Sequence, residues 1–351
     1  MRVIEARNVE EALRMGVGLL GSIGERLPSR AGAVLVAPHP VMTVYHSPME
    51  RVLLCQHRDA NPFFHLFESL WMLSGSNDAR WLDRFVSDFS SRFGEPGSGE
   101  QWGAYGYRWR RHWDTDQLEA VIRRLSRDPY DRRVVIGMWD PTYDLIDPAE
   151  MEEGGREPRD LPCNTHLYPR IRADEYGQLV LDLTICCRSN DIIWGAYGAN
   201  AVHFSVLQEY LAHGLSARVG RMYQLSNNWH AYVDVFDRVA RAQQEPVRHA
   251  YPMETVGPEP MFDKVLPLVQ WDHDLGRFLE DPERDEEVYG HSWFGGVAAR
   301  MWRSHECYRR RDYEGALNMA RSVMASDWRL AATEWIVRRM SRTRELSKDR
   351  A

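Results

Sequence analysis

The chain has 351 residues, of which 44% are hydrophobic and 27% charged, and its formal net charge is −7. This composition is typical of a globular protein, and the length suits one large α/β domain with a helical addition. The lack of a long apolar run predicts no membrane span, and the net acidity predicts no nucleic-acid binding. Because the acid-rich N-terminal stretch lacks a signal-peptide core, we expect a cytoplasmic protein.

The cysteines and the basic residues limit the kinds of site that the protein can contain. The odd count of five cysteines and the absence of a C-x-x-C pair exclude a zinc ribbon and a disulfide framework, and they favour a reducing compartment. Of the 44 basic residues all but Lys264 and Lys348 are arginine, which disfavours a lysine Schiff base or a P-loop. Arginine is suited to holding phosphate with two hydrogen bonds at once.

The first half of the chain alternates helical and extended patterns. The apolar run 62–73 predicts a buried helix that Gly75 ends, and 117–127 has helical periodicity. The β-branched run RRVVIGMW, residues 132–139, predicts a short strand, and the Pro-, Glu- and Gly-rich stretch 141–160 predicts an exposed loop.

Two further strands are predicted at 166–172 and 179–187, with a turn at Tyr176–Gly177. A long helix over 200–213 and a strand over 219–227 follow.

The composition changes after about residue 240. We therefore expect a catalytic domain over 1–240 and a helical C-terminal extension over 241–351, with a frayed charged tail from Ser341.

Cys163, in the segment DLPCNTH, is the first candidate for chemistry. A lone cysteine is most often structural, but Arg188 and Ser189 follow at the end of a strand predicted to pair nearby, and Arg132 and Arg133 precede another strand. A guanidinium near a thiol lowers the thiol pKa, and arginines with a serine hydroxyl can hold a phosphate. The pattern indicates covalent catalysis on a phosphorylated substrate.

Six segments carry a resemblance to a known family. They are NPFFHLFESLWMLSG, WGAYGYRWR, DRRVVIGMWDP, DLPCNTHLY, CCRSNDIIWGAYGANAVHFSVLQEYLA and GRMYQLSNNWH. In this order they resemble the thymidylate synthase and pyrimidine-nucleotide hydroxymethylase superfamily over roughly residues 25–235. The resemblance implies an α/β (α+β) fold with a mixed, mostly antiparallel sheet backed by helices. It also implies a homodimer that takes a pyrimidine nucleoside monophosphate and 5,10-methylenetetrahydrofolate.

The resemblance assigns catalytic roles to four residues. Cys163 matches the nucleophile that adds to C6 of the pyrimidine, which makes C5 nucleophilic toward the one-carbon unit. Glu68 and Tyr105 match members of a proton-transfer network, and a glutamate in so apolar a helix needs a partner in any case. Asp191 matches an aspartate that faces folate and the base, although an aspartate here can also cap a turn.

Nucleotide-binding roles follow in the same way. Arg188, Ser189 and Arg30 match phosphate ligands, and Arg132 and Arg133 match a pair that reaches across a dimer interface into the neighbouring site. For each arginine, simple exposure to solvent is the alternative.

Asn200 matches the residue that reads the base and favours uracil, although it can also cap the helix it opens. Gly195 lets the backbone approach the base and folate, and Phe89 falls where methylating enzymes have a tryptophan beside folate. Tyr223 falls at a sugar-reading position. One extra residue between Gly195 and Asn200 leaves the register at the base open.

The extension and the missing tryptophan favour water over hydride as the final reactant. Methylating members end soon after the core with a tail that closes the site, and a dry site favours hydride transfer. We therefore predict a 5-hydroxymethyl product, with reductive methylation to dTMP as the alternative. The sequence does not decide whether the base is uracil or cytosine, or whether the sugar is ribose or deoxyribose.

Other classes of protein fit less of the sequence. A non-catalytic nucleotide-binding homologue requires an inert Cys163, and a Cys–His hydrolase requires Cys163 and His166, which face opposite sides of a strand. A metal site at 272–274 is disfavoured because adjacent residues do not converge, so we expect no metal. A scaffold protein leaves the arginine and cysteine pattern unexplained.

Overall fold

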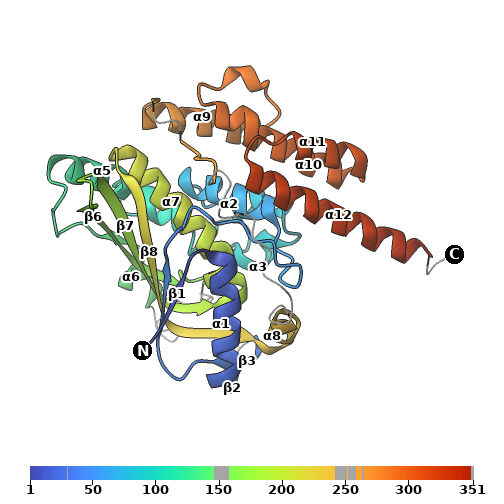
Figure 1. The fold of residues 1–351 in the computed structure, drawn as a ribbon, viewed down its shortest axis with the longest axis horizontal. Coiled ribbons are helices and arrows are strands. Elements are labelled where there is room, and N and C mark those ends of the chain that lie inside the picture. The colour runs from blue at the N-terminus through green and yellow to red at the C-terminus, as the bar shows by residue number, and fades with distance from the viewer. Residues whose placement is uncertain (30, 146–157, 242–250, 252–257, 263–264, 349–351) are drawn as a thin grey trace.

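The computed structural model describes residues 1–29, 31–145, 158–241, 251, 258–262 and 265–348. Eight strands form one mixed sheet that is backed by helices (Figure 1), which confirms the predicted α/β class. The strands are β1 (Arg2–Ala6), β2 (Glu25–Ser29), β3 (Gly32–Val36), β4 (Val41–Tyr45), β5 (Ile136–Gly137), β6 (Asn164–Ala173), β7 (Leu179–Asp191) and β8 (Arg218–Tyr232).

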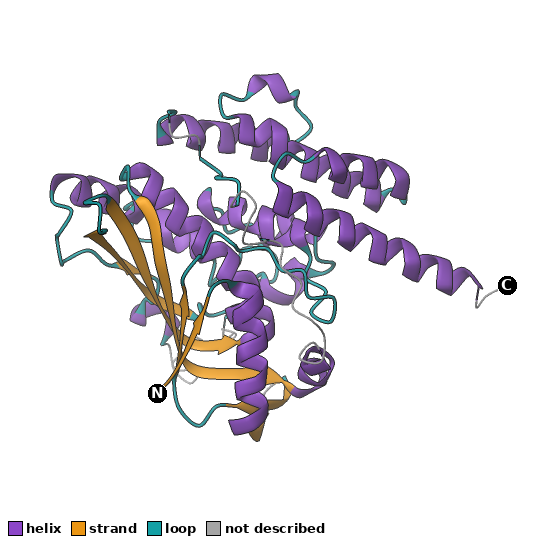
Figure 2. Ribbon diagram, viewed as in Figure 1, coloured by secondary structure: helices purple, strands orange, loops and turns teal. Residues whose placement is uncertain are grey.

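Helices precede, connect and follow these strands (Figure 2). The α-helices are α1 (Val9–Ile23), α2 (Pro62–Leu73), α3 (Phe89–Phe93), α4 (Tyr105–Arg110), α5 (Gln117–Arg127), α6 (Pro141–Asp144), α7 (Asn200–Gly214), α8 (Val233–Ala240), α9 (Leu268–Glu280), α10 (Arg300–Arg309), α11 (Tyr313–Ser322) and α12 (Ser326–Lys348). The described residues also form 3-10 helices at Ala79–Arg84 and Glu286–Val288 and π-helices at Ile192–Ala199 and Phe294–Ala299.

The sheet runs in the order β1-β4-β8-β7-β6-β5, and β2 and β3 form a hairpin against β8. The pairs β1–β4 and β7–β8 are parallel and the other described pairs are antiparallel. A parallel pair needs a crossover connection, and α7 supplies it between β7 and β8. The end of β7 and the start of α7 therefore meet at one end of the two central strands.

The predicted helices and central strands are confirmed, and local chemistry explains where they begin and end. The Asn61 side chain accepts from the backbone N–H groups of Phe63 and Phe64, and Pro62 occupies the first turn of α2. Gly75 follows α2 with φ of 72°, a left-handed conformation that glycine adopts without strain.

Two predicted segments differ from the structure. The strand predicted over 132–139 shortens to β5, because the N–H groups of Met138 and Trp139 both point to the Thr165 carbonyl and α6 begins directly afterwards. The predicted loop 141–160 begins with α6, and 146–157 lies outside the described residues. The chain from Ser341 continues α12 to Lys348, so the predicted fraying at Ser341 is replaced by helix.

The two faces of the central strands differ in burial. In one row across β6, β7 and β8 lie Leu167, Ile185 and Gln224, all fully buried under the helices. In the adjacent row lie Tyr168, Thr184 and Tyr223, which are half-buried or exposed. Because successive strand residues point to opposite faces, the sheet has an inner face against the helices and an outer face.

The C-terminal helices pack on α2 from above the sheet (Figure 1). Phe67 of α2 stacks on Phe278 of α9 with ring centroids 5.9 Å apart and meets Trp302 of α10 edge-on at 5.6 Å. Phe63 meets Trp335 of α12 at 5.4 Å. The extension therefore shares a hydrophobic core with the catalytic part.

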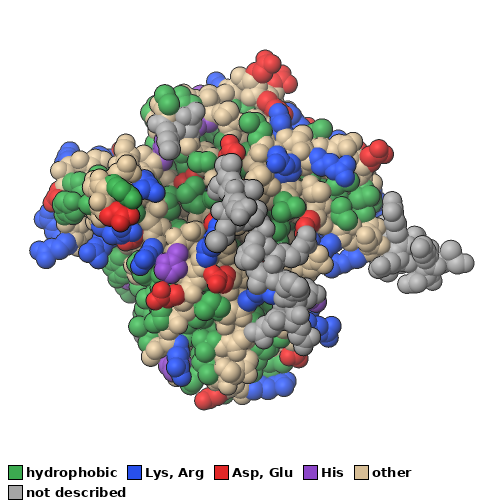
Figure 3. Space-filling model, viewed as in Figure 1, with side chains coloured by type: hydrophobic (Ala, Val, Ile, Leu, Met, Phe, Trp, Pro, Cys, Tyr) green, Lys and Arg blue, Asp and Glu red, His purple; other side chains and the backbone are tan. Residues whose placement is uncertain are grey.

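Within the described residues, no helix combines the length and apolar character that a membrane crossing requires. On the face drawn in Figure 3, acidic and basic side chains lie intermixed among apolar ones.

Candidate active site

Cys163 lies in the loop that leads into β6, at the inner face of the sheet, and is partly exposed. Arg188 of β7 holds this loop: its Nε donates to the Pro162 carbonyl at 3.0 Å and its Nη2 donates to the Leu161 carbonyl at 3.1 Å. The Arg188 backbone N–H also donates to the Cys163 carbonyl at 2.9 Å. The predicted neighbours Cys163 and Arg188 are thus brought together, with the guanidinium acting partly as a backbone clamp.

The electrostatics of the Cys163 thiol differ from the sequence expectation. Burial raises its pKa above the ordinary value of 9, and this effect outweighs the positive charge of Arg188, which acts in the opposite direction. The carboxylates of Asp160 and Asp191 raise the pKa further. In the free protein the sulfur is therefore mainly a thiol at neutral pH, because desolvation exceeds the attraction of the single nearby cation.

Tyr105 and Glu68 lie beside the cysteine loop. The Tyr105 hydroxyl of α4 accepts from the Asn164 backbone N–H at 3.3 Å, and its pKa is raised by burial and by the nearby Cys163. Glu68 of α2 is 7% exposed, and its Oε2 lies 3.0 Å from Nε2 of the buried His203 on α7. His203 is thus the ionisable neighbour of Glu68, although neither of these two atoms makes a hydrogen bond among the described residues, and no pattern in the sequence identified it.

Asp191 ends β7 and begins the π-helix Ile192–Ala199. Its Oδ1 accepts from the backbone N–H groups of Ile193 at 2.8 Å and Trp194 at 2.6 Å, so the capping role is present. Burial raises the carboxyl pKa, and the Trp194 N–H and the charge of His230 partly counter that rise. The segment Ile192–Ala199 is not a regular helix, because the backbone angles of Tyr197 and Gly198 are non-helical, and this kink lies between Gly195 and Asn200.

A short chain of side-chain amides crosses the site. Asn200 donates from Nδ2 to Asn190 Oδ1 at 3.1 Å, and Asn190 donates from Nδ2 to Ser226 Oγ at 3.1 Å. Asn200 is the first residue of α7, but its side chain bonds Asn190 and does not cap the helix. A Cβ at Gly195 would lie 2.5 Å from Asn190 Oδ1, so this position must be glycine for the amides to meet.

Gln224 is a residue that the sequence missed. It is fully buried on the inner face, two residues before Ser226 on the same strand, and neither its Oε1 nor its Nε2 has a hydrogen-bond partner among the described residues.

Tyr223, the predicted sugar-reading residue, points to the outer face, where its strand neighbours are Val44 and Thr184. The irregular register between Leu181 and Leu183 shifts the pairing by one residue, and counting along the sequence cannot reveal such a shift.

The remaining predicted residues are spread more widely. Ser189 is half-buried on β7 opposite Asn228, one residue beyond Arg188. Arg132 and Arg133 are exposed, and Arg133 pairs with Asp131 at 2.9 Å, so within one chain neither joins the Cys163 cluster. Phe89 is buried against Phe64 and Phe93. Arg30 lies outside the described residues.

Asp160 is the second residue that the sequence analysis passed over, although it stands three positions before Cys163. Its Oδ2 accepts from Gln101 Nε2 at 2.6 Å. Burial is the largest influence on this carboxyl and raises its pKa to about 6. The segment DLPCNTH already shows an aspartate near the cysteine, but only the fold shows that its side chain is partly buried beside the cysteine loop.

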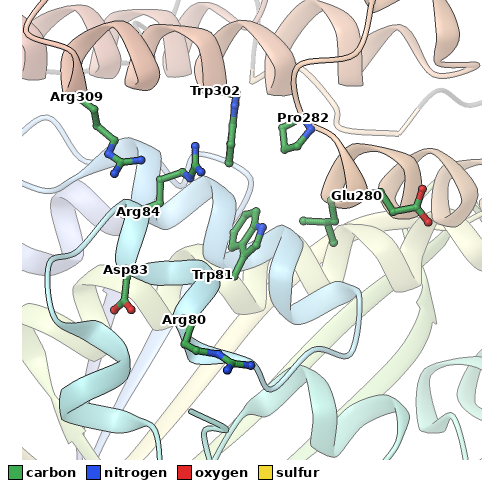
Figure 4. Close-up of a pocket in the computed structure, with 9 residues that line it drawn as sticks. Arg80, Trp81, Asp83, Arg84, Glu280, Pro282, Trp302 and Arg309 are labelled. Atoms are coloured by element: carbon green, nitrogen blue, oxygen red, sulfur yellow. The ribbon is translucent and has the colours of Figure 1, made fainter. Parts of the chain in front are cut away.

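A separate cavity of about 460 Å³ lies where the 3-10 helix Ala79–Arg84 meets α9 and α10 (Figure 4). Trp302 and Arg84 line it, and the Arg84 guanidinium lies over the Trp302 ring at 4.5 Å while pairing with Glu306 at 2.8 Å. None of the residues predicted for the site lines this cavity.

The alternative sites are not assembled. His166 stacks on Tyr168 of the outer face, and Asp272 accepts from the Tyr210 hydroxyl while Asp274 accepts from the His291 N–H. Among the described residues, no three His, Cys, Asp or Glu side chains are arranged to hold a metal ion.

A thiol held beside an arginine, a buried glutamate and a chain of amide groups, on a mixed sheet of this order, is the arrangement expected of a transferase of the predicted family. The comparison with known proteins agrees with this class. The family model of thymidylate synthase matches residues 44–262. The chain belongs to the thymidylate synthase family, whose one-carbon donor is 5,10-methylenetetrahydrofolate.

Relatives of two kinds are found. The chain is 40% identical to the deoxyuridylate hydroxymethyltransferase of Pseudomonas phage M6 over 97% of this chain and 95% of that protein. It is 29% identical to the enzyme of the same name from Bacillus phage SP01 over 75% of this chain and 70% of that protein. The thymidylate synthase of Streptococcus mutans is 31% identical over 42% of this chain and 47% of its own length.

Proposed function

We propose that this enzyme transfers a one-carbon unit to C5 of dUMP and releases 5-hydroxymethyl-dUMP. The observation that carries this proposal is the similarity to the phage M6 enzyme over 97% of the chain, because that alignment includes the helical extension beyond the family model. The thymidylate synthase relative aligns over less than half of the chain.

The site supports uracil as the base. The described hydrogen bond of Asn200 uses Nδ2, and its carbonyl Oδ1 is an acceptor suited to N3–H of uracil. Cytosine has an acceptor at N3 and would need a donor there. Gln224, buried beside Ser226, offers a second amide for the nucleotide and takes the sugar-reading position that the sequence gave to Tyr223.

The catalytic roles follow from the geometry around the thiol. In our proposal Cys163 loses its proton when the substrate phosphate and base fill the site, and its sulfur adds to C6. Glu68, with His203, and Tyr105 move protons at the base. Asp191, Gly195 and Phe89 face the folate.

For the phosphate we propose Arg188, Ser189 and Arg30. Among the described residues, Nη1 of Arg188 makes no hydrogen bond, which leaves it for a phosphate oxygen.

The product assay tests the proposal. The enzyme is incubated with 5,10-methylenetetrahydrofolate and, separately, dUMP, UMP, dCMP or CMP, and products are identified by mass spectrometry. We expect hydroxymethyl-dUMP without formation of dihydrofolate, since water and not hydride completes the reaction. Formation of dTMP with an equal amount of dihydrofolate would establish the thymidylate synthase alternative, and turnover of no nucleotide would indicate a binding homologue.

We also propose a homodimer that shares its sites. The outer face of the sheet carries the apolar side chains of Tyr168, Cys186 and Leu225, partly accessible in the single chain, and a second copy would cover them. The exposed Arg132 and Arg133 would then complete the partner's phosphate site.

Mixing inactive Cys163→Ala and Arg133→Ala chains tests this arrangement. Random reassembly should restore roughly a quarter of the wild-type activity, because half of the dimers then contain one intact site. A mixture no more active than its components would contradict shared sites.

We also propose a domain boundary and a cellular compartment for the enzyme. We assign residues 1–240 to the catalytic domain and 241–351 to an extension that packs on it. All five cysteines are free thiols, which supports a cytoplasmic location.

A further inference from the structure

Asp160 is held in a fixed position at the edge of the cysteine loop. Gln101 donates to its Oδ2 at 2.6 Å, and a Cβ at Gly103 would lie 2.9 Å from the same oxygen. Only a glycine at 103 lets the turn wrap so closely around the carboxyl. The carboxyl is partly exposed, and Gln101 is its only hydrogen-bond partner among the described residues.

Asp160 directly precedes Leu161 and Pro162, whose carbonyls Arg188 holds, so it lies beside the candidate site. Its electrostatic neighbours come from α2, α4, the cysteine loop and β7, and they are Glu68, Tyr105, Arg108, Cys163 and Arg188. The two cations are otherwise engaged, since Arg108 pairs with Asp144 at 2.7 Å and Arg188 holds backbone carbonyls. Asp160 therefore lacks a dedicated ion-pair partner and lies beside a second acid.

The two carboxyls of the site have different surroundings. Glu68 lies deep in the core with His203 3.0 Å away, whereas Asp160 is partly exposed and bonded by a neutral amide. Burial and the nearby Glu68 raise the Asp160 pKa to about 6, and Arg188 only partly offsets this. Pairs of acids with such different environments commonly divide the acid and base steps of a reaction. A carboxylate of this pKa is ionised at neutral pH yet basic enough to accept a proton from water.

We propose that Asp160 is the catalytic base that activates the water molecule in the hydroxymethylating step, an inference that rests on the proposed function. The step starts from a nucleotide bonded at C6 to Cys163, with a methylene group doubly bonded to C5. The water oxygen bonds to the methylene carbon, the double-bond electrons move through C5 to the C4 carbonyl oxygen, and the water proton passes to Asp160. The resulting enolate then expels the Cys163 thiolate from C6 and restores the C5–C6 double bond, so no oxidant or reductant is needed.

Asp160→Asn is the matched substitution, because the amide oxygen still accepts from Gln101 while the basic site is lost. Wild type and variant, each in excess over dUMP tritiated at C5, are compared in a single turnover with 5,10-methylenetetrahydrofolate. Tritium release reports events before water adds, and hydroxymethyl-dUMP reports completion. We expect tritium release within a few-fold of wild type, with product formation lowered by on the order of 100-fold or more.

Two further readouts separate catalysis from positioning. An added thiol should trap the methylene carbon as a thioether in the Asp160→Asn reaction, and Asp160→Glu should restore part of the product. The wild-type rate of product formation should fall as pH drops below about 6, where the carboxylate takes up a proton.

Failure of the role proposed for Asp160 and failure of the proposed function give different results. If wild type forms hydroxymethyl-dUMP and Asp160→Asn forms it at the same rate, or loses tritium release to the same extent as product, the role of Asp160 is overturned while the proposed function stands. If wild type forms dTMP, no water adds and the proposed function itself fails.

Discussion

At position 188 a guanidinium bonds two carbonyl oxygens of the loop that carries Cys163. The same side chain is the cation that lowers the thiol pKa, against a larger rise from burial. One residue thus positions the cysteine loop and acts on the charge of the thiol. The net result is a thiol whose pKa is raised in the free protein.

The rate at which iodoacetamide alkylates Cys163 measures how burial and Arg188 together set the thiol pKa. Because only the thiolate reacts and its pKa lies above 9, we expect the wild-type rate to rise about tenfold per pH unit between pH 6 and 8. Arg188→Gln should slow the reaction further at each pH, since it removes the favourable cation. The rate is followed by mass spectrometry of the Cys163 peptide, with the buried Cys187 as an internal reference. A rate that does not depend on pH would contradict the raised pKa.

Between β7 and α7, the kinked segment Ile192–Ala199 leads from Asp191 to Asn200. The chain of amides from Ser226 through Asn190 to Asn200 closes across it. The close approach at Gly195 makes this possible. The segment therefore holds Asn200 against Asn190.

Gly195→Ala tests this element. The new Cβ would lie 2.5 Å from Asn190 Oδ1 and 3.2 Å from Asn200 Nδ2, so the amides must separate. We expect a loss of about 1–3 kcal/mol in the free energy of unfolding and weaker dUMP binding, measured by urea titration and calorimetry. Gly276→Ala in α9 is the control, because its Cβ meets nothing within 4 Å. Equal effects of the two substitutions would count against the argument.

At the scale of the whole molecule, the extension is fixed to the catalytic part by an aromatic core and by one carboxylate. Asp59, just before α2, accepts from Arg338 at 3.0 Å, from Arg339 at 2.8 Å and from Arg342 at 3.0 Å, all on α12. Asp59 has φ of 48°, a left-handed conformation uncommon outside glycine. Its carboxylate offsets part of the charge of three guanidinium groups.

The substitution Asp59→Asn keeps the size and shape of the side chain and removes its negative charge. We expect a loss of about 1–3 kcal/mol in the free energy of unfolding, since partly buried guanidinium groups lose their counter-ion. Burial opposes ionisation of Asp59, but the hydrogen bond and charge of Arg339 outweigh it and lower the pKa. The stabilisation is therefore present above the ordinary pKa near 4 and is lost as pH falls further.

Urea unfolding followed by tryptophan fluorescence at pH 7 and pH 3 provides the measurement. Arg342→Gln, whose side chain is 57% exposed, should cost less and serves as the control. No difference between wild type and Asp59→Asn at pH 7 would show that the aromatic core alone holds α12.

Local patterns in the sequence predicted α2, α5 and α7 and the pair β6–β7, because helix caps, glycine ends and alternating apolar residues act over a few positions. They failed over 132–139, where regular pairing with β6 is confined to Ile136 and Gly137, and the N–H groups of Met138 and Trp139 share one carbonyl acceptor. They also failed beyond Ser341, where the predicted frayed tail is helix as far as Lys348.

The sequence by itself determined the family, and it predicted the cysteine segment and the arginines proposed for the phosphate, because each is carried by neighbouring residues. Only the tertiary structure decided which side of β8 faces the helices, that His203 lies beside Glu68, and that Asp160 is partly buried and bonded by Gln101. These properties depend on strand register and on contacts between distant segments. A shift of one residue in pairing reverses a strand's faces without changing any local pattern.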